Sequence, residues 1–148
     1  MIRYALAGLL LLLAACTSPN HAANLPGEAE SKSFTAGGIE MYGKEGRLGF
    51  APQGDSDLSR GGHFLLYFWG KPEELADTYS LVGEHVETGL RRELYPDWEV
   101  SRADNPAGAD AHSGAKFTLD EDGQHKGKWR LEIYMGEKFF DSIEVEAR

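Results

Sequence analysis

The sequence predicts an all-β domain, an immunoglobulin-like antiparallel β-sandwich of about seven to nine strands. Three observations support this fold class. Two segments near the C-terminus, KWRLEIYM and FFDSIEVEA, alternate between apolar and polar residues, which is typical of half-buried strands. Many of the 18 glycines stand at breaks between such segments, where tight turns are expected. One stretch alone, PEELADTYSLV, is compatible with a helix, and there we expect a short helical turn near residues 72–78.

The first residues, 1–15, have the pattern of a lipoprotein signal peptide. Arg3 precedes an apolar run, Ala5 to Ala15, that contains no charged side chain. As a helix this run would measure roughly 17 Å, too short for the hydrocarbon core of about 30 Å. Small residues followed by Cys16 resemble the lipobox of bacterial lipoproteins, in which the cysteine receives a diacylglycerol group and the peptidase cuts just before it. We therefore expect Cys16 to be the lipid attachment site and the first residue of the mature chain.

Cys16 is the single cysteine of the chain. Once lipidated, it leaves no thiol for a disulfide, a redox reaction or a nucleophile. The alternative is a chance cysteine in an ordinary secretory signal. The expected location is the cell envelope, lipid-anchored and extracytoplasmic, on the outer face of the plasma membrane. In a host with two membranes the outer membrane is expected, because Thr17 is not the aspartate that favours inner-membrane retention.

Composition divides the remaining chain into a tether and one domain. Residues 16–33 contain few large apolar side chains, so we expect a flexible tether that lets the domain stand away from the membrane. Residues 34–148 suit one β-sandwich domain. The formal net charge of −9 disfavours nucleic acid, which is itself a polyanion.

The internal strands are expected in the following order. GRLGFA forms a short strand. HFLLYFW, residues 63–69, is apolar on both faces, which predicts either a central strand covered on both sides or a strand whose outer face meets a partner. YSLVGEHV and LRREL form a hairpin across Glu87, Thr88 and Gly89. DWEVSR and AKFTL each place their apolar residues on one face.

The closing hairpin has a testable register. A two-residue turn at Gly136 and Glu137 would mix the two faces of the strands. A three-residue connection, residues 136–138, brings apolar residues opposite one another and is therefore predicted. The expected pairs are Met135 with Phe139, Leu131 with Ile143, and Trp129 with Val145.

Three segments, LVGEHVETG, GADAH and WRLEIYMGEKFFDSIEVE, carry a resemblance to known proteins. Together they resemble an uncharacterised family of bacterial lipoproteins best represented among Gram-positive spore-formers. The similarity covers residues 45–148 and rests on short motifs. It implies an immunoglobulin-like domain behind a lipobox signal peptide, and it implies no particular activity.

The segment NPAGADAHSG holds the clearest candidate ligands, Asp110 and His112. On extended backbone these side chains point the same way and could share a metal ion. A zinc site needs three or four ligands, so His63, His85 or His125 would have to converge on them. The simpler interpretation is that Asp110 caps a turn and His112 hydrogen-bonds a loop to the sandwich.

The acidic segment LDEDGQHKGK does not have the spacing of an EF-hand calcium loop. If Asp120 and Asp122 took the third and fifth positions, Trp129 would stand at the twelfth and could not supply a carboxylate. We therefore expect a hairpin turn on Asp122 and Gly123, with His125 exposed.

The aromatic residues divide into core and surface candidates. Phe68, Trp69 and Trp98 are expected in the core, because a small sandwich needs much aromatic area there. Tyr95 is the candidate binding residue, since Pro96 interrupts strand pairing and places an amphipathic ring near a loop.

Three functions are compatible with these residues. The favoured one is a non-enzymatic binding or assembly module held at the envelope by lipid on Cys16, contacting an envelope protein or glycan. The alternative is a metal-binding or metal-dependent protein that uses Asp110 and His112. The third is a hydrolase assembled from distant residues; no catalytic residue is identified, and no cofactor is expected.

Overall fold

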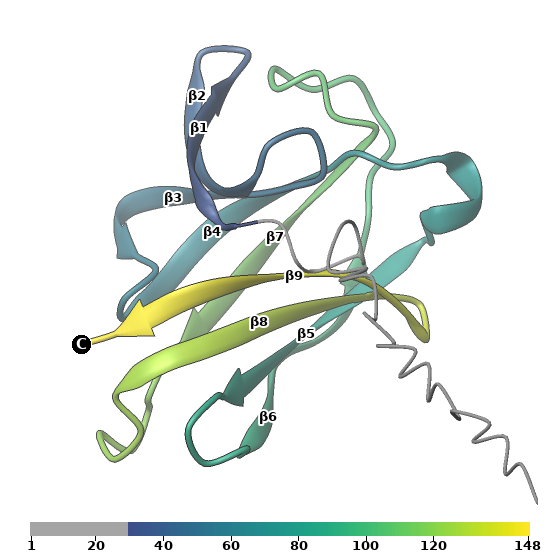
Figure 1. The fold of residues 1–148 in the computed structure, drawn as a ribbon. Helices are drawn as coiled ribbons and strands as arrows, with labels where there is room; N and C mark the ends of the chain where they lie inside the picture. The colour runs from purple at the N-terminus through teal and green to yellow at the C-terminus, as the bar shows by residue number, and fades with distance from the viewer. Residues whose placement is uncertain (1–29) are drawn as a thin grey trace, which may run out of the picture.

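The computed structural model describes residues 30–148, which form nine strands and one 3₁₀ turn (Figure 1). The predicted signal peptide, Cys16 and nearly all of the tether lie outside the described residues. In chain order the elements are β1 (Lys32–Ala36), β2 (Ile39–Lys44), β3 (Leu48–Asp57), β4 (Gly61–Phe68), η1 (Pro72–Glu74), β5 (Thr78–His85), β6 (Arg91–Glu99), β7 (Ala111–Thr118), β8 (Gly127–Met135) and β9 (Lys138–Ala147).

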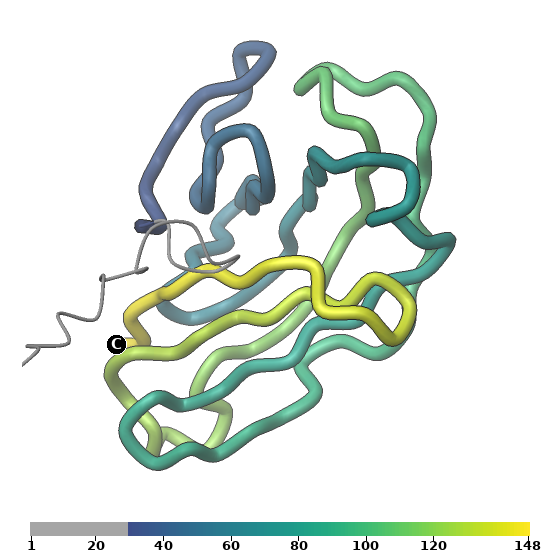
Figure 2. Tube along the Cα trace, turned by 45° about the vertical axis from the view of Figure 1, so that its right-hand side comes forward, coloured from purple at the N-terminus to yellow at the C-terminus, as the bar shows by residue number. Residues whose placement is uncertain are grey.

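The strands form two packed sheets, which confirms the predicted antiparallel β-sandwich (Figures 1 and 2). One sheet, here called sheet A, has the order β1-β2-β3-β4-β7, and sheet B has the order β6-β5-β8-β9. All neighbouring strands are antiparallel. The 3₁₀ turn η1, in the connection from β4 to β5, confirms the short helical turn expected there. No helix within residues 30–148 is long and apolar enough to cross a membrane.

The core lies between the sheets and follows the alternation in the sequence. On β8 the predicted inward residues Trp129, Leu131, Ile133 and Met135 are buried. They pack with the inward residues of the facing sheet, including Phe50, Phe64, Leu66, Phe68 and Phe117. The prediction that Phe68 belongs to the core is therefore confirmed.

A second, smaller core covers the outer face of sheet A. The first hairpin, β1–β2, and the loop before β7 supply Phe34, Met41 and Ala107, which pack on Tyr67 of β4. Trp69 lies against this cluster and is partly buried, rather than lying in the main core as expected. This arrangement explains why the β4 segment is apolar on both faces: one face meets sheet B and part of the other meets the hairpin and loop.

The closing hairpin differs from its predicted register at one point. Leu131 pairs with Ile143 and Trp129 with Val145, as predicted. However, the turn has two residues, so Met135 pairs with Lys138, and an irregularity follows between Ile133 and Tyr134. The extra residue of this bulge is Phe140, which is buried while Phe139 is 45% exposed. A β-bulge restores the inward face that a two-residue turn alone would have mixed.

The connection between β7 and β8 is not the hairpin that was expected at Asp122 and Gly123. A turn does form there, with the Gly123 N–H donating to the Asp120 carbonyl at 3.0 Å. Its two strands belong to different sheets, so the turn carries the chain from sheet A to sheet B. His125 is consequently half-buried against Trp129 and His85, not exposed.

Candidate functional site

One open side of the sandwich, between β6 and β7, has the features of a contact surface. Each strand is the edge of its own sheet, so no strand within residues 30–148 closes this side, which we call the β6–β7 seam (Figure 2). Near the end of β6 the seam is held by the Ser113 hydroxyl, which donates to the Glu99 carbonyl at 2.6 Å, and by a hydrogen bond from the Tyr79 hydroxyl to the Gly114 carbonyl. The sheets are thus fixed relative to one another beside an uncovered edge.

Tyr95 and Trp98 form an aromatic pair on this edge. Their ring centroids are 5.6 Å apart, and the Tyr95 ring packs inward on the buried Tyr79 at 6.4 Å. Trp98 is 52% exposed, so the expectation that it belongs to the core is wrong. That expectation rested on the aromatic area a small sandwich needs, and it did not foresee the irregular pairing of β6 with β5 around Leu81.

A groove of about 350 Å³ lies farther along the same seam. Leu94, Phe117 and Trp129 supply apolar lining, while Arg92 and Lys116 bring positive charge and Glu93, Asp120 and Glu121 bring negative charge. A partly apolar depression with charged side chains around it is common at protein contact sites.

The acidic residues of β6 differ from its arginines in their pairing. Arg91 binds Glu84 and Glu132, and Arg92 binds Asp122 at 2.7 Å. Glu93, Asp97 and Glu99 are exposed, and within the described part of the chain they have no ion-pair partner. The edge that carries Trp98 therefore presents free negative charge.

The loop after β7 brings together three groups that could hold a cation, Asp120, Asp122 and His125, with ligand atoms within 4.8 Å of one another. Sequence reasoning tested these aspartates only against EF-hand spacing and missed their proximity to His125. All three already have partners: Asp122 accepts from Arg92, His125 Nδ1 lies 3.0 Å from Asp122 Oδ1, and Asp120 Oδ1 accepts the His125 backbone N–H. Hydrogen bonds from Arg92, the Gln124 N–H and His125 hold the pKa of Asp122 well below its usual range. The arginine serves as the counter-ion of this loop.

Asp110 and His112 do not form a metal centre with the described histidines. The Gly70 N–H donates to Asp110 Oδ2 at 2.9 Å, so this carboxylate fastens the connection that follows β4, whereas the simpler interpretation had it cap a turn. His112 hydrogen-bonds the neighbouring loop through its backbone, which exchanges two hydrogen bonds with Ser101. Its Nε2 is buried and has no hydrogen-bond partner in the part of the chain that the structure describes. Among the described residues no third ligand joins this pair.

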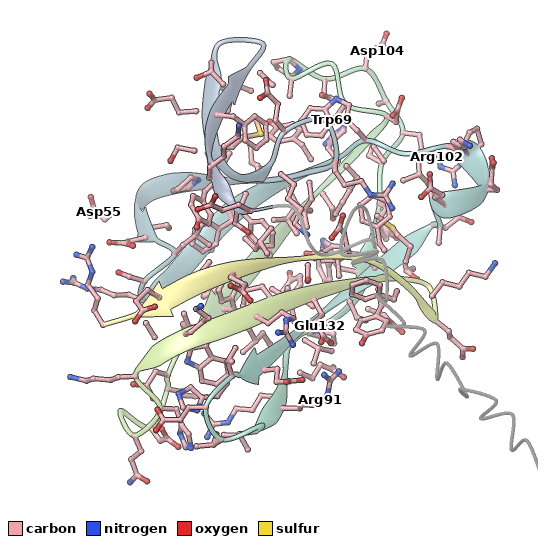
Figure 3. The ribbon with its side chains drawn as sticks, in the orientation of Figure 1. Asp55, Trp69, Arg91, Arg102, Asp104 and Glu132 are labelled. Atoms are coloured by element: carbon pink, nitrogen blue, oxygen red, sulfur yellow. The ribbon has the colours of Figure 1, made fainter. Side chains whose placement is uncertain are left out.

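A dense charged network occupies the outer face of sheet B, where Figure 3 labels Arg91 and Glu132. Arg91 donates to both oxygens of Glu132, at 3.0 and 2.7 Å, and Tyr134 donates to Glu132 at 2.8 Å. Burial alone would raise the pKa of Glu132, but the hydrogen bonds from Arg91 and Tyr134 outweigh it and lower the pKa. Both oxygens of the carboxylate are satisfied, so the network suits stabilisation of the sheet and offers no free acid or base.

Comparison with known proteins supports the fold. No family model matches the sequence, and no curated protein matches it. A similar solved structure is described as a "Putative Lipoprotein from Bacillus anthracis". It is 20% identical, with a TM-score of 0.55, and the match covers 81% of this chain and 86% of that chain. At this identity the likeness shows a shared fold.

Proposed function

We propose that this chain is a lipid-anchored protein of the cell envelope whose sandwich domain is a non-enzymatic binding module. The β6–β7 seam is its contact surface, and the occupant is a protein segment that carries cationic side chains. The observation that carries the proposal is Trp98, 52% exposed beside Tyr95 on an edge strand with unpaired carboxylates.

The anchoring part of the proposal rests on the sequence around Cys16. An apolar run too short to span a membrane ends in small residues and then the single cysteine. The description of the structural neighbour as a lipoprotein agrees with this assignment. Two or three acyl chains on one residue hold a protein at a membrane essentially permanently.

The choice of a cationic protein segment rests on the chemistry of the seam. An exposed indole attracts arginine and lysine through cation–π contact, worth about 0.5–1 kcal/mol at such sites. Glu93, Asp97 and Glu99 supply complementary charge along the same strand. The partly apolar groove then follows, into which a neighbouring side chain of the partner could fit.

Site-specific photo-crosslinking in the intact envelope tests this surface. A photoreactive amino acid replaces Trp98 in one full-length variant and Asp55, an exposed residue of β3, in the control. We expect the probe at residue 98 to form a discrete protein adduct that excess oligo-arginine prevents, and the probe at residue 55 to form none. Adducts with envelope glycan, or identical adducts from both positions, would contradict the proposal.

A further inference from the structure

Lys44 and Asp141 form a buried ion pair between the two sheets. Lys44 ends β2 in sheet A, and Asp141 lies in β9 at the edge of sheet B. The Lys44 Nζ is 2.7 Å from Asp141 Oδ1, and the two side chains are only 5% and 6% exposed. An amine and a carboxyl group separated by 97 positions in the chain are thus held in contact away from solvent.

The lysine is poorly satisfied as an ammonium ion. An ammonium has three N–H donors, but Asp141 is the one acceptor that Lys44 reaches within residues 30–148. A buried charge with unmet hydrogen bonds is costly, and pairing recovers only part of that cost. Condensation requires a neutral amine and a neutral acid, which one proton transfer across the 2.7 Å contact supplies.

The carboxyl group, in contrast, is held by additional donors. The Ser142 backbone N–H donates to Oδ1 at 2.7 Å, and Arg47 Nε lies 3.5 Å from Oδ2. Arg47 is itself fixed, because its guanidinium stacks 3.8 Å from the centre of the Phe140 ring and binds Glu74 at 2.8 Å. The carboxyl carbon therefore has a fixed orientation toward the amine, with a positive group behind its other oxygen.

We propose that Lys44 and Asp141 condense to an amide crosslink in the folded protein. After proton transfer to Oδ1, the amine lone pair forms an Nζ–Cγ bond, and the C=O π electrons move to Oδ2, where Arg47 stabilises the negative charge. A second proton passes from Nζ to Oδ1, the Cγ–Oδ1 bond breaks, and one water leaves. Ammonium plus carboxylate thus gives one neutral amide and one water, and no other reactant is needed.

The fold favours this step in two ways. Holding two reacting groups in contact in one geometry replaces a bimolecular encounter, which can be worth effective molarities of about 10⁵ M or more. The neutral product also removes two buried charges, whereas hydrolysis would have to restore them.

The crosslink would join the two sheets covalently. It would tie the first hairpin, which follows directly on the predicted tether, to the last strand of the domain. A mechanical force applied at the lipid anchor would then be transmitted to β9 through a covalent bond. Without the crosslink, the hydrogen bonds of β1 and β2 alone would carry that force.

Tryptic mapping of the denatured full-length chain tests the proposal directly. A crosslinked Lys44 cannot be cleaved, so peptide 33–47 should be found joined to peptide 139–148, at the sum of their masses less one water. Separate peptides 33–44 and 139–148 from wild-type protein shown to be folded would overturn the proposal.

Two controls make the mapping specific. The variant Lys44→Arg keeps the positive charge but lacks the amine, and it should yield no branched peptide. The exposed pair Lys128 and Glu144, 3.6 Å apart, should remain uncrosslinked in the same digest. A branched peptide at that exposed pair would show that burial is not what drives condensation and would contradict the argument.

Discussion

The guanidinium of Arg92 on β6 lies 2.7 Å from Oδ2 of Asp122, and this ion pair fastens the sheet-crossing loop to the edge of sheet B. The same carboxylate accepts the Gln124 N–H at 2.9 Å. The Asp122 side chain thus organises the loop that borders the groove of the β6–β7 seam.

This contact predicts a pH dependence of stability. Because hydrogen bonds from Arg92 lower the folded-state pKa of Asp122 below the unfolded value of about 3.9, its contribution is fully present at neutral pH. It decreases as the pH falls below about 4 and is lost below the folded-state pKa. We expect Asp122→Asn to lower the urea midpoint at pH 7 more than at pH 3. Equal losses at both pH values, or a loss matched by the exposed control Asp55→Asn, would contradict this.

The charged network on sheet B predicts a larger loss of stability than the Asp122 contact does. Glu132→Gln removes the charge that Arg91 grips through two hydrogen bonds, so we expect unfolding to become about 1–3 kcal/mol easier. Glu146→Gln, at an exposed position of β9, should change stability by less than about 0.5 kcal/mol. Denaturant unfolding measures both, and similar values for the two variants would show that the network contributes nothing.

The second core predicts an unusual need for glycine at residue 49. A Cβ there would overlap the side chain of Met41, so Gly49→Ala should cost about 1–3 kcal/mol through overpacking. Gly114 lies on the same face of sheet A, and its Cβ would approach nothing closer than the Phe64 carbonyl oxygen, at 3.7 Å. We therefore expect Gly114→Ala to be tolerated. Thermal unfolding of the two variants compares these sites, and equal destabilisation would argue against the packing described.

The bulge in the closing hairpin predicts opposite outcomes for adjacent residues. Phe140 is 3% exposed and Phe139 is 45% exposed. Phe140→Ala should cost about 3–5 kcal/mol, as for other buried aromatic residues, and Phe139→Ala should cost under about 1 kcal/mol. Denaturant unfolding measures both costs. If Phe139→Ala proved more costly than Phe140→Ala, the result would support the three-residue turn that the sequence pattern favours.

Local patterns in the sequence predict the strands well, and long-range features less well. Strict alternation identifies β8 and the buried side of β7, because successive side chains of a strand point to opposite faces of the sheet. The bulge at Phe140 leaves no local signal, since either of two adjacent phenylalanines could face inward. The sheet crossing after β7 was also missed, because a turn sequence does not reveal which sheet the next strand joins.

The candidate site was only partly predictable for the same reason. Pro96 lies within β6, where pairing with β5 is irregular but continues, so the expectation that Tyr95 lies near a loop is wrong. Tyr95 instead lies in an edge strand of the sheet. Trp98 was assigned to the core on composition, although irregular pairing of β6 leaves it exposed. The three acids of β6 became notable only once the structure showed which arginines are already paired.

The covalent state of Cys16 tests the central claim most directly, because a binding domain anchored to the envelope requires lipid there. The measurement is mass spectrometry of the N-terminal peptide from full-length protein extracted from bacterial membranes. We predict that the peptide begins at Cys16 and carries a thioether-linked diacylglycerol, and that Cys16→Ser releases the protein from the membrane. A mature chain with a free Cys16 thiol, or one cleaved beyond residue 16, would contradict the account.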